Sequence, residues 1–116
     1  MIRFENVVKQ YGKSKVRAVD DLTLHVPKGS TLGFIGPNGA GKTTTIRLLT
    51  GILQPTSGRV LVDGIDMAKD PIAAKRLIGF VPDAHEMYDR LTGMEYLNFM
   101  ADVYNVSRSE GKAHIE

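Results

Sequence analysis

Alternating apolar and polar residues predict β-strands in the first third of the chain. The strictest alternation covers residues 22–26, where Leu22, Leu24 and Val26 fall on one face, and residues 27–29 end that strand. A looser alternation predicts an earlier strand at three apolar positions, which are Ile2, Phe4 and Val7. The apolar run at residues 30–35 predicts a third strand directly after the second.

Helices and strands alternate in the rest of the chain. The expected elements are a helix at 43–50, strands at 59–62 and 78–81, and helices at 71–77 and 93–104. Pro71 suits a first helical turn, and Thr92 with Glu95 has the spacing of a capping box. A last helix begins at Ser107 or Ser109. The chain begins with strands alone and continues with alternating strands and helices. This order predicts an α/β core joined to an antiparallel sheet.

Composition allows one globular domain at most and narrows the class of protein little further. The 116 residues are 42% hydrophobic and 24% charged, with 15 basic and 13 acidic side chains and no cysteine. Disulfides and thiolate metal sites are therefore excluded, and no basic block predicts nucleic-acid binding. The start resembles no secretory signal, and no apolar run is long enough to cross a membrane, so we expect a soluble, cytosolic chain.

The strongest chemical signal is a phosphate-binding loop of the pattern G-x-x-x-x-G-K-[ST]. Its glycines allow the backbone to wrap a phosphate, and the following helix directs the positive end of its dipole at the same place. Lys42 would reach the β- and γ-phosphates, and the Thr43 hydroxyl would coordinate Mg²⁺. The alternative is a glycine-rich turn that binds nothing. The candidate nucleotide-binding residues are Gly36, Pro37, Asn38, Gly39, Ala40, Gly41, Lys42, Thr43 and Thr44.

Other motifs narrow the kind of phosphate-loop protein. The Asp-x-x-Gly and Asn-Lys-x-Asp elements of a GTPase are missing from the sequence. Arg59, Arg76 and Arg90 are scattered without the lid pattern of a small-molecule kinase, which weakens that hypothesis. The loop by itself therefore predicts the ligand class and leaves the function open.

Segments on both sides of the loop resemble the N-terminal part of the ATP-binding subunit of an ABC transporter, over nearly the whole chain. The matching segments are 18–22, 26–29, 49–58, 62–64 and 78–82. The resemblance implies a partial P-loop ATPase core, with ATP and Mg²⁺ as ligands. It implies an antiparallel β-subdomain at 1–30 and 58–66, core at 31–57 and 67–83, and a truncated helical subdomain beginning at 84–116.

The resemblance also gives a role to Tyr11, which precedes the loop as does the family's adenine-stacking aromatic residue. A π-face stacks well on a purine, whereas a tyrosine beside a Gly-Lys turn is otherwise an ordinary surface aromatic.

Two aspartates are candidates for a metal-binding role. Asp63 ends an apolar strand, but it lies only about twenty residues after Lys42 and precedes Gly64, so a hairpin turn is the favoured interpretation. Asp83 stands where the family usually has glutamine, or glutamate in an exporter-like branch. Aspartate can bind Mg²⁺ through oxygen but is shorter and charged, so Asp83 is a possible ligand, with an ordinary loop residue as the alternative.

The expected partners follow from the resemblance. The segment from Asp83 to Tyr96 corresponds to the family's contact with a transmembrane permease, and His85 is expected to face that partner. A second ATP-binding subunit would complete each nucleotide site. The chain would then lie in the cytoplasm, peripheral to the membrane through its permease, with no nucleic acid as a partner.

Several family elements are missing from these residues. They contain no Leu-Ser-Gly-Gly signature, no later strand ending in Asp-Glu, and no switch histidine, because His114 lacks the required context. We expect an N-terminal portion of an ABC-type ATPase that powers export, with nucleotide binding but almost no hydrolysis by this chain alone. The alternatives are a non-enzymatic nucleotide-binding or interaction module, and an ABC-type ATPase acting outside transport.

Overall fold

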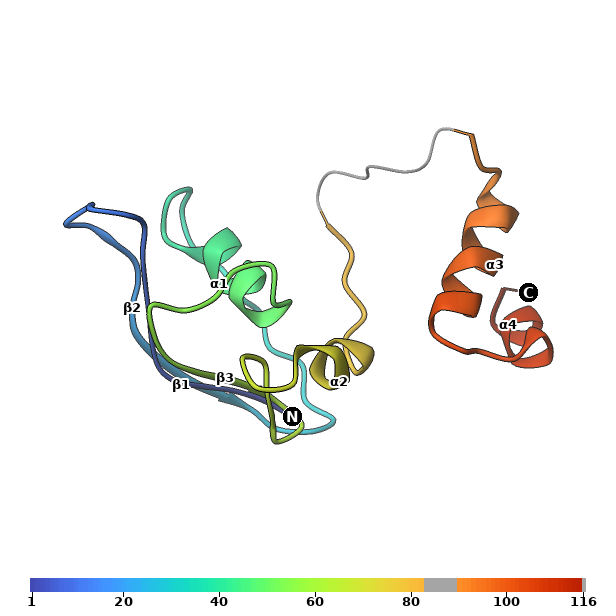
Figure 1. The fold of residues 1–116 in the computed structure, drawn as a ribbon, viewed down its shortest axis with the longest axis horizontal. Helices are drawn as coiled ribbons and strands as arrows, with labels where there is room; N and C mark the ends of the chain where they lie inside the picture. The colour runs from blue at the N-terminus through green and yellow to red at the C-terminus, as the bar shows by residue number, and fades with distance from the viewer. Residues whose placement is uncertain (83–89, 116) are drawn as a thin grey trace. The chain divides into compact units, whose positions relative to one another are not determined.

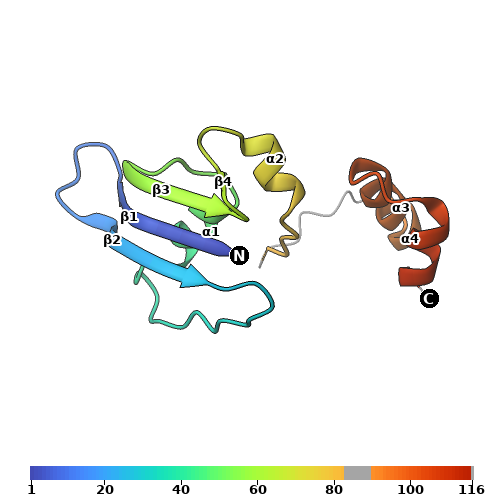
Figure 2. The same cartoon turned by 90° about the horizontal axis from the view of Figure 1, so that it is seen from below.

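A four-stranded antiparallel sheet organises the first part of the computed structural model, which describes residues 1–82 and 90–115. The order across the sheet is β2-β1-β3-β4, so β1 is central although it comes first in the chain (Figures 1 and 2). The strands are β1 (Ile2–Gln10), β2 (Arg17–Val26), β3 (Ser57–Val62) and β4 (Ile65–Asp66). The mixed α/β class with an N-terminal antiparallel sheet is therefore as predicted.

The irregular alternation in β1 comes from a bulge at Asn6. Phe4 and Val7 are both buried although three positions separate them, and the register with β2 shifts between them. Asn6 has a φ of 47° and Asp21 opposite has a φ of 50°. The Asn6 side-chain amide donates to the Asp21 carboxylate at 3.0 Å. Strict alternation from Phe4 would place Val7 on the opposite face of the sheet. The extra residue at the bulge places it on the buried face instead.

Gly58 in β3 packs directly against this bulge. It has a φ of +83°, and a Cβ placed there would lie 2.3 Å from the Asn6 carbonyl oxygen. Only glycine fits at so close an approach, because it has neither the side chain nor the conformational restriction of other residues.

Asp63 and Gly64 form the turn of the β3–β4 hairpin. Leu61 pairs with Asp66 and Val62 with Ile65, and the two residues between have positive φ values of 51° and 82°. A two-residue loop of this kind matches the twist of the flanking strands. The hairpin interpretation of Asp63 is therefore confirmed.

Two helices belong to the same unit as the sheet. Helix α1 (Lys42–Leu49) lies over one face and buries Thr45 and Leu48 (Figure 2). Helix α2 (Pro71–Arg76) contacts β4, with Pro71 in its first turn and Asp70 as its N-cap. The buried core residues are Phe4, Val7, Val19, Leu48, Val60, Val62, Met67 and Ala74.

The predicted strands at 30–35 and 78–81 are wrong. Both segments lack regular secondary structure, and no strand in 1–82 or 90–115 pairs with them. Leu32, Phe34 and Ile35 are exposed, Ile35 by 93%. An apolar run becomes a strand only when a neighbour supplies hydrogen bonds along its length, and the sheet of this unit supplies none there.

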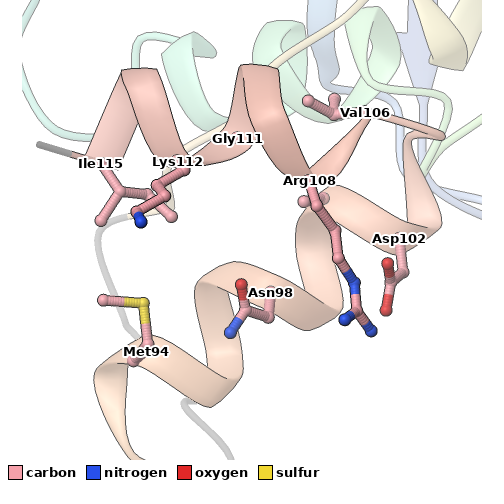
Figure 3. Close-up of a pocket in the computed structure, with 9 residues that line it drawn as sticks. Met94, Asn98, Asp102, Val106, Arg108, Gly111, Lys112 and Ile115 are labelled. Carbon is pink, nitrogen blue, oxygen red and sulfur yellow. The ribbon is translucent and has the colours of Figure 1, made fainter.

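The chain divides into two units by its internal contacts, Met1–Phe80 and Val81–Glu116. The second contains α3 (Gly93–Val103) and α4 (Arg108–Ile115), which agree with the predicted helices to within a residue or two. Between them lies an open cavity of about 430 Å³ (Figure 3). Its labelled lining residues include Met94, Asn98 and Asp102 from α3 and Arg108, Lys112 and Ile115 from α4. Asp83 and His85 lie outside the described residues.

The capping box of α3 makes its first turn sensitive to acid. Thr92 N–H donates to the Glu95 carboxylate at 2.7 Å, and Thr92 Oγ1 accepts from Glu95 N at 3.3 Å. The hydrogen bonds from Thr92, the backbone one foremost, lower the pKa of Glu95 from its ordinary 4.5. A carboxyl whose pKa is lowered by folding stabilises the folded form above its unfolded pKa, and this contribution is lost as the pH falls through the folded value.

We therefore expect Glu95 to titrate below 4.5, and the first turn of α3 to loosen as the pH falls through that midpoint. Carboxyl and amide NMR shifts would measure both. Glu95→Gln retains an acceptor without a titrating group, so its amide shifts at Thr92 and Glu95 should lose this transition. A Glu95 midpoint at or above 4.5 would contradict the role of the capping box.

Candidate nucleotide-binding site

The phosphate-binding loop closes into α1 through local hydrogen bonds. Ala40 N–H donates to the Pro37 carbonyl at 3.2 Å, and Thr45 N–H donates to the Gly41 carbonyl at 2.9 Å. Gly39 and Gly41 have φ values of +83° and +93°, which only glycine adopts readily. Gly41 is the N-cap of α1, and no side chain caps that end. The amides of the first turn therefore remain available to an anion.

The C-terminal end of the loop lies in very close contact with strand β2. A Cβ on Gly41 would lie 2.3 Å from the Ala18 carbonyl oxygen. At the start of the loop, a Cβ on Gly36 would lie 3.3 Å from the Ala40 side chain. Gly41 thus meets a packing requirement as well as a conformational one, whereas Gly36 meets only a close contact with the Ala40 side chain.

A cavity of about 340 Å³ opens at this end of α1. Its size lies within the range of small-molecule sites in proteins. Lys42 and Thr44 are half-buried, Thr43 is exposed, and Lys42 Nζ donates to the Gly36 carbonyl. No acidic side chain occupies the first turn of α1, so Lys42 and the helix dipole both favour an anion. The lining residues are Ala18, Asn38, Gly39, Gly41, Lys42, Thr43 and Thr44.

Tyr11 lies at the edge of this site. It follows β1 directly, the residue is 46% exposed, and its hydroxyl is 3.4 Å from Thr44 Oγ1. Lys9 Nζ lies over the Tyr11 ring, 5.3 Å from its centroid. The fold therefore brings the predicted aromatic residue next to the phosphate-binding loop, across 33 positions of sequence.

Asp63 does not line this cavity. Asp63 lies in the β3–β4 turn, where its carboxylate is 3.6 Å from the Met1 amino group and its N–H donates to the Met1 carbonyl at 2.8 Å. Asp83 falls among residues 83–89, which the structure does not describe.

Sequence reasoning did not single out two residues near this site, Ala18 and Lys9. Ala18 lines the cavity from β2, and a small apolar residue in a strand gives no chemical signal. Lys9 precedes Tyr11 by two positions, a spacing that places both on one side of an extended segment. That spacing was the one signal available for Lys9.

Comparison with known protein families decides the class. The model of the ABC transporter family matches residues 19–115. This chain belongs to the ABC transporter ATP-binding family. It is 41% identical to the ABC transporter ATP-binding protein NatA of Bacillus subtilis, over 90% of its own length and 43% of that protein. It is 38% identical to the linearmycin resistance ATP-binding protein LnrL of the same species, over 97% of its length and 35% of that protein.

Solved structures of ABC transporter subunits share the fold. The ATP-binding subunit of an ABC transporter superposes with a TM-score of 0.86 at 28% identity, covering 94% of this chain and 45% of that one. The dimeric bacterial cassette MJ0796 superposes with a TM-score of 0.80 at 27% identity, covering 90% of this chain and 48% of that one. The chain thus spans under half the length of these family members. In the part of the chain that the structure describes, no helix is long and apolar enough to cross a membrane.

Proposed function

We propose that this chain binds Mg-ATP at the phosphate-binding loop, as part of an ABC transporter ATPase that powers export. The observation that carries the proposal is the cradle itself. Gly41 packs on the Ala18 carbonyl, and Lys42 and the uncapped start of α1 border one cavity. Such a cradle suits a triphosphate, because backbone amides and one ammonium group can converge on its oxygens. The residues proposed to bind nucleotide are Tyr11, Gly36, Pro37, Asn38, Gly39, Ala40, Gly41, Lys42, Thr43 and Thr44.

Adenine is the base that we assign to the site, with Tyr11 as its stacking partner. Tyr11 is nearly half exposed, and its hydroxyl lies 3.4 Å from Thr44 Oγ1 on α1. Stacking on an aromatic ring needs only a free face, so a base tethered to phosphates in the loop would find one there. A solved family member, MJ0796, has been captured with ADP and phosphate bound, which agrees with this assignment.

The residues also fit Mg²⁺ bound together with the nucleotide. Mg²⁺ keeps several waters and binds proteins through one or two ligands together with substrate phosphates. The exposed Thr43 hydroxyl at the start of α1 would be one such ligand, and the Asp83 carboxylate is proposed as a second. The ion would neutralise charge on the phosphate oxygens.

By itself the chain should hydrolyse ATP negligibly. Phosphoryl transfer depends on groups that orient the attacking water and stabilise the developing charge. The 116 residues contain neither the Leu-Ser-Gly-Gly signature nor a later strand ending in Asp-Glu to provide these groups. Binding without turnover is thus the activity we propose for these residues alone.

The partners we propose are a transmembrane permease, contacted through the segment from Asp83 to Tyr96, and a second ATP-binding subunit. The dimeric state of MJ0796 supports the second of these. Such partners would place the chain in the cytoplasm at the membrane surface.

Calorimetric titration with ATP, with and without Mg²⁺, and a phosphate-release assay test this function together. We expect saturable binding that Mg²⁺ strengthens, and no phosphate release above the buffer. A chain that binds no ATP at millimolar concentration would contradict the nucleotide site. Steady turnover that Lys42→Ala abolishes would contradict the proposed inactivity.

A further inference from the structure

Lys9 is a half-buried lysine whose ammonium group has two partners. Its Nζ donates to the Gln54 carbonyl at 2.8 Å and lies 5.3 Å from the centroid of the Tyr11 ring. A lysine ammonium is strongly hydrated in water, so partial burial favours a fixed position where partners replace that water. Lys13 and Lys15, in the adjacent turn, are exposed. Lys9 is therefore distinguished from its neighbours by burial and by contacts.

The Gln54 partner belongs to the segment that leaves α1, and that segment is fastened to the end of β1. Thr56 N–H donates to the Val8 carbonyl at 2.8 Å, and Gln10 N–H donates to Thr56 Oγ1 at 3.0 Å. Lys9 thus lies in a hydrogen-bonded segment of β1, where its ammonium contacts both the exit of α1 and the ring of Tyr11. The Tyr11 hydroxyl lies 3.4 Å from Thr44 Oγ1, in the first half of α1.

We propose that Lys9 is a positioning residue for the base of the bound nucleotide. Its ammonium holds one face of Tyr11 by a cation–π interaction, which leaves the opposite face for the base. The Thr44 contact fixes the tip of the same ring relative to the phosphate-binding loop. The ring is therefore ordered before the nucleotide arrives, so binding costs less side-chain entropy than it would with a free tyrosine.

This inference rests on the proposed nucleotide site. Binding measurements with two ligands distinguish a role of Lys9 in positioning the base from the existence of the nucleotide site itself. Mg-ATP has a base to stack, whereas Mg-tripolyphosphate presents only the phosphates. A residue that acts through Tyr11 affects the first ligand and leaves the second unchanged. A residue that holds the loop or adds general positive charge affects both.

The experiment is calorimetric titration of the whole chain with each ligand. Lys9→Met should weaken Mg-ATP binding about three- to tenfold and change tripolyphosphate binding less than about twofold. Lys9→Gln, which keeps a donor for the Gln54 carbonyl but has no charge, should behave as Lys9→Met does. Lys9→Arg keeps the cation and should restore Mg-ATP affinity to within about twofold of the original. Lys13→Met removes one charge from the next turn and serves as the matched control.

Equal losses for both ligands in Lys9→Met, or full Mg-ATP affinity in Lys9→Gln, would overturn the positioning role. If the unsubstituted chain binds neither ligand, the proposed nucleotide site itself is wrong, and this result requires no variant. Thermal unfolding of each variant is expected to stay within a few degrees of the original.

Discussion

Lys42→Ala should weaken Mg-ATP binding by about ten- to a hundredfold. A hydrogen bond to a charged group contributes about 1.5–3 kcal/mol, and a factor of ten in affinity corresponds to about 1.4 kcal/mol. Lys42 is half-buried at the start of α1 and already directs its ammonium at the loop, where it donates to the Gly36 carbonyl. Isothermal titration calorimetry would measure the loss.

Arg47→Ala provides the matched control for this prediction. Arg47 is an exposed basic residue in the last turn of the same helix, so its removal takes away one charge without touching the loop. We expect its effect on Mg-ATP affinity to stay below about threefold, as for a screened surface charge. Similar losses in the two variants would mean that bulk charge, rather than a specific contact, holds the triphosphate.

Gly41→Ala is expected to lower the free energy of unfolding of the first unit by about 2–4 kcal/mol. Two effects add. The φ of +93° costs any residue with a side chain, and the new Cβ would lie 2.3 Å from the Ala18 carbonyl oxygen. The loop would have to move away from β2, so Mg-ATP binding should fall together with stability. Urea denaturation followed by circular dichroism would measure the change in stability.

Gly39→Ala separates the two effects. Gly39 has a similar φ of +83°, but a Cβ placed there would have no atom within 4 Å. Its cost should be only the backbone strain, about 1–2 kcal/mol. If Gly39→Ala proved as destabilising as Gly41→Ala, the close approach of the loop to β2 would not be what fixes Gly41.

The fold was predictable where local patterns carry the information. Strict alternation located the end of β2, and the capping box at Thr92 located the start of α3. β1 had a weaker pattern because its bulge at Asn6 shifts the buried face by one residue. The error at residues 30–35 has a different origin. Apolar residues there satisfy the pattern of a buried strand, but strand formation depends on a neighbour that no local pattern reveals.

The site shows the same division between local and distant information. The loop around Gly36 and Lys42 was visible because its residues are contiguous and its chemistry depends on spacing. Asp63 was correctly assigned to a hairpin because Asp-Gly is itself the turn signal. The contact of Ala18 with Gly41 and that of Lys9 with the Gln54 carbonyl could not be predicted, because each joins residues far apart in the sequence and neither residue type indicates such a contact.

The central position of β1 has a consequence for the order in which the molecule folds. Its pairing with β2 joins residues close in sequence, whereas Glu5 pairs with Arg59 across more than fifty positions. The phosphate-binding loop lies within the connection that this second pairing must close. Closing a long connection is entropically costly and slow, whereas a hairpin forms in microseconds. Nucleotide binding should therefore appear late in refolding, in step with the docking of β3 rather than with the first hairpin.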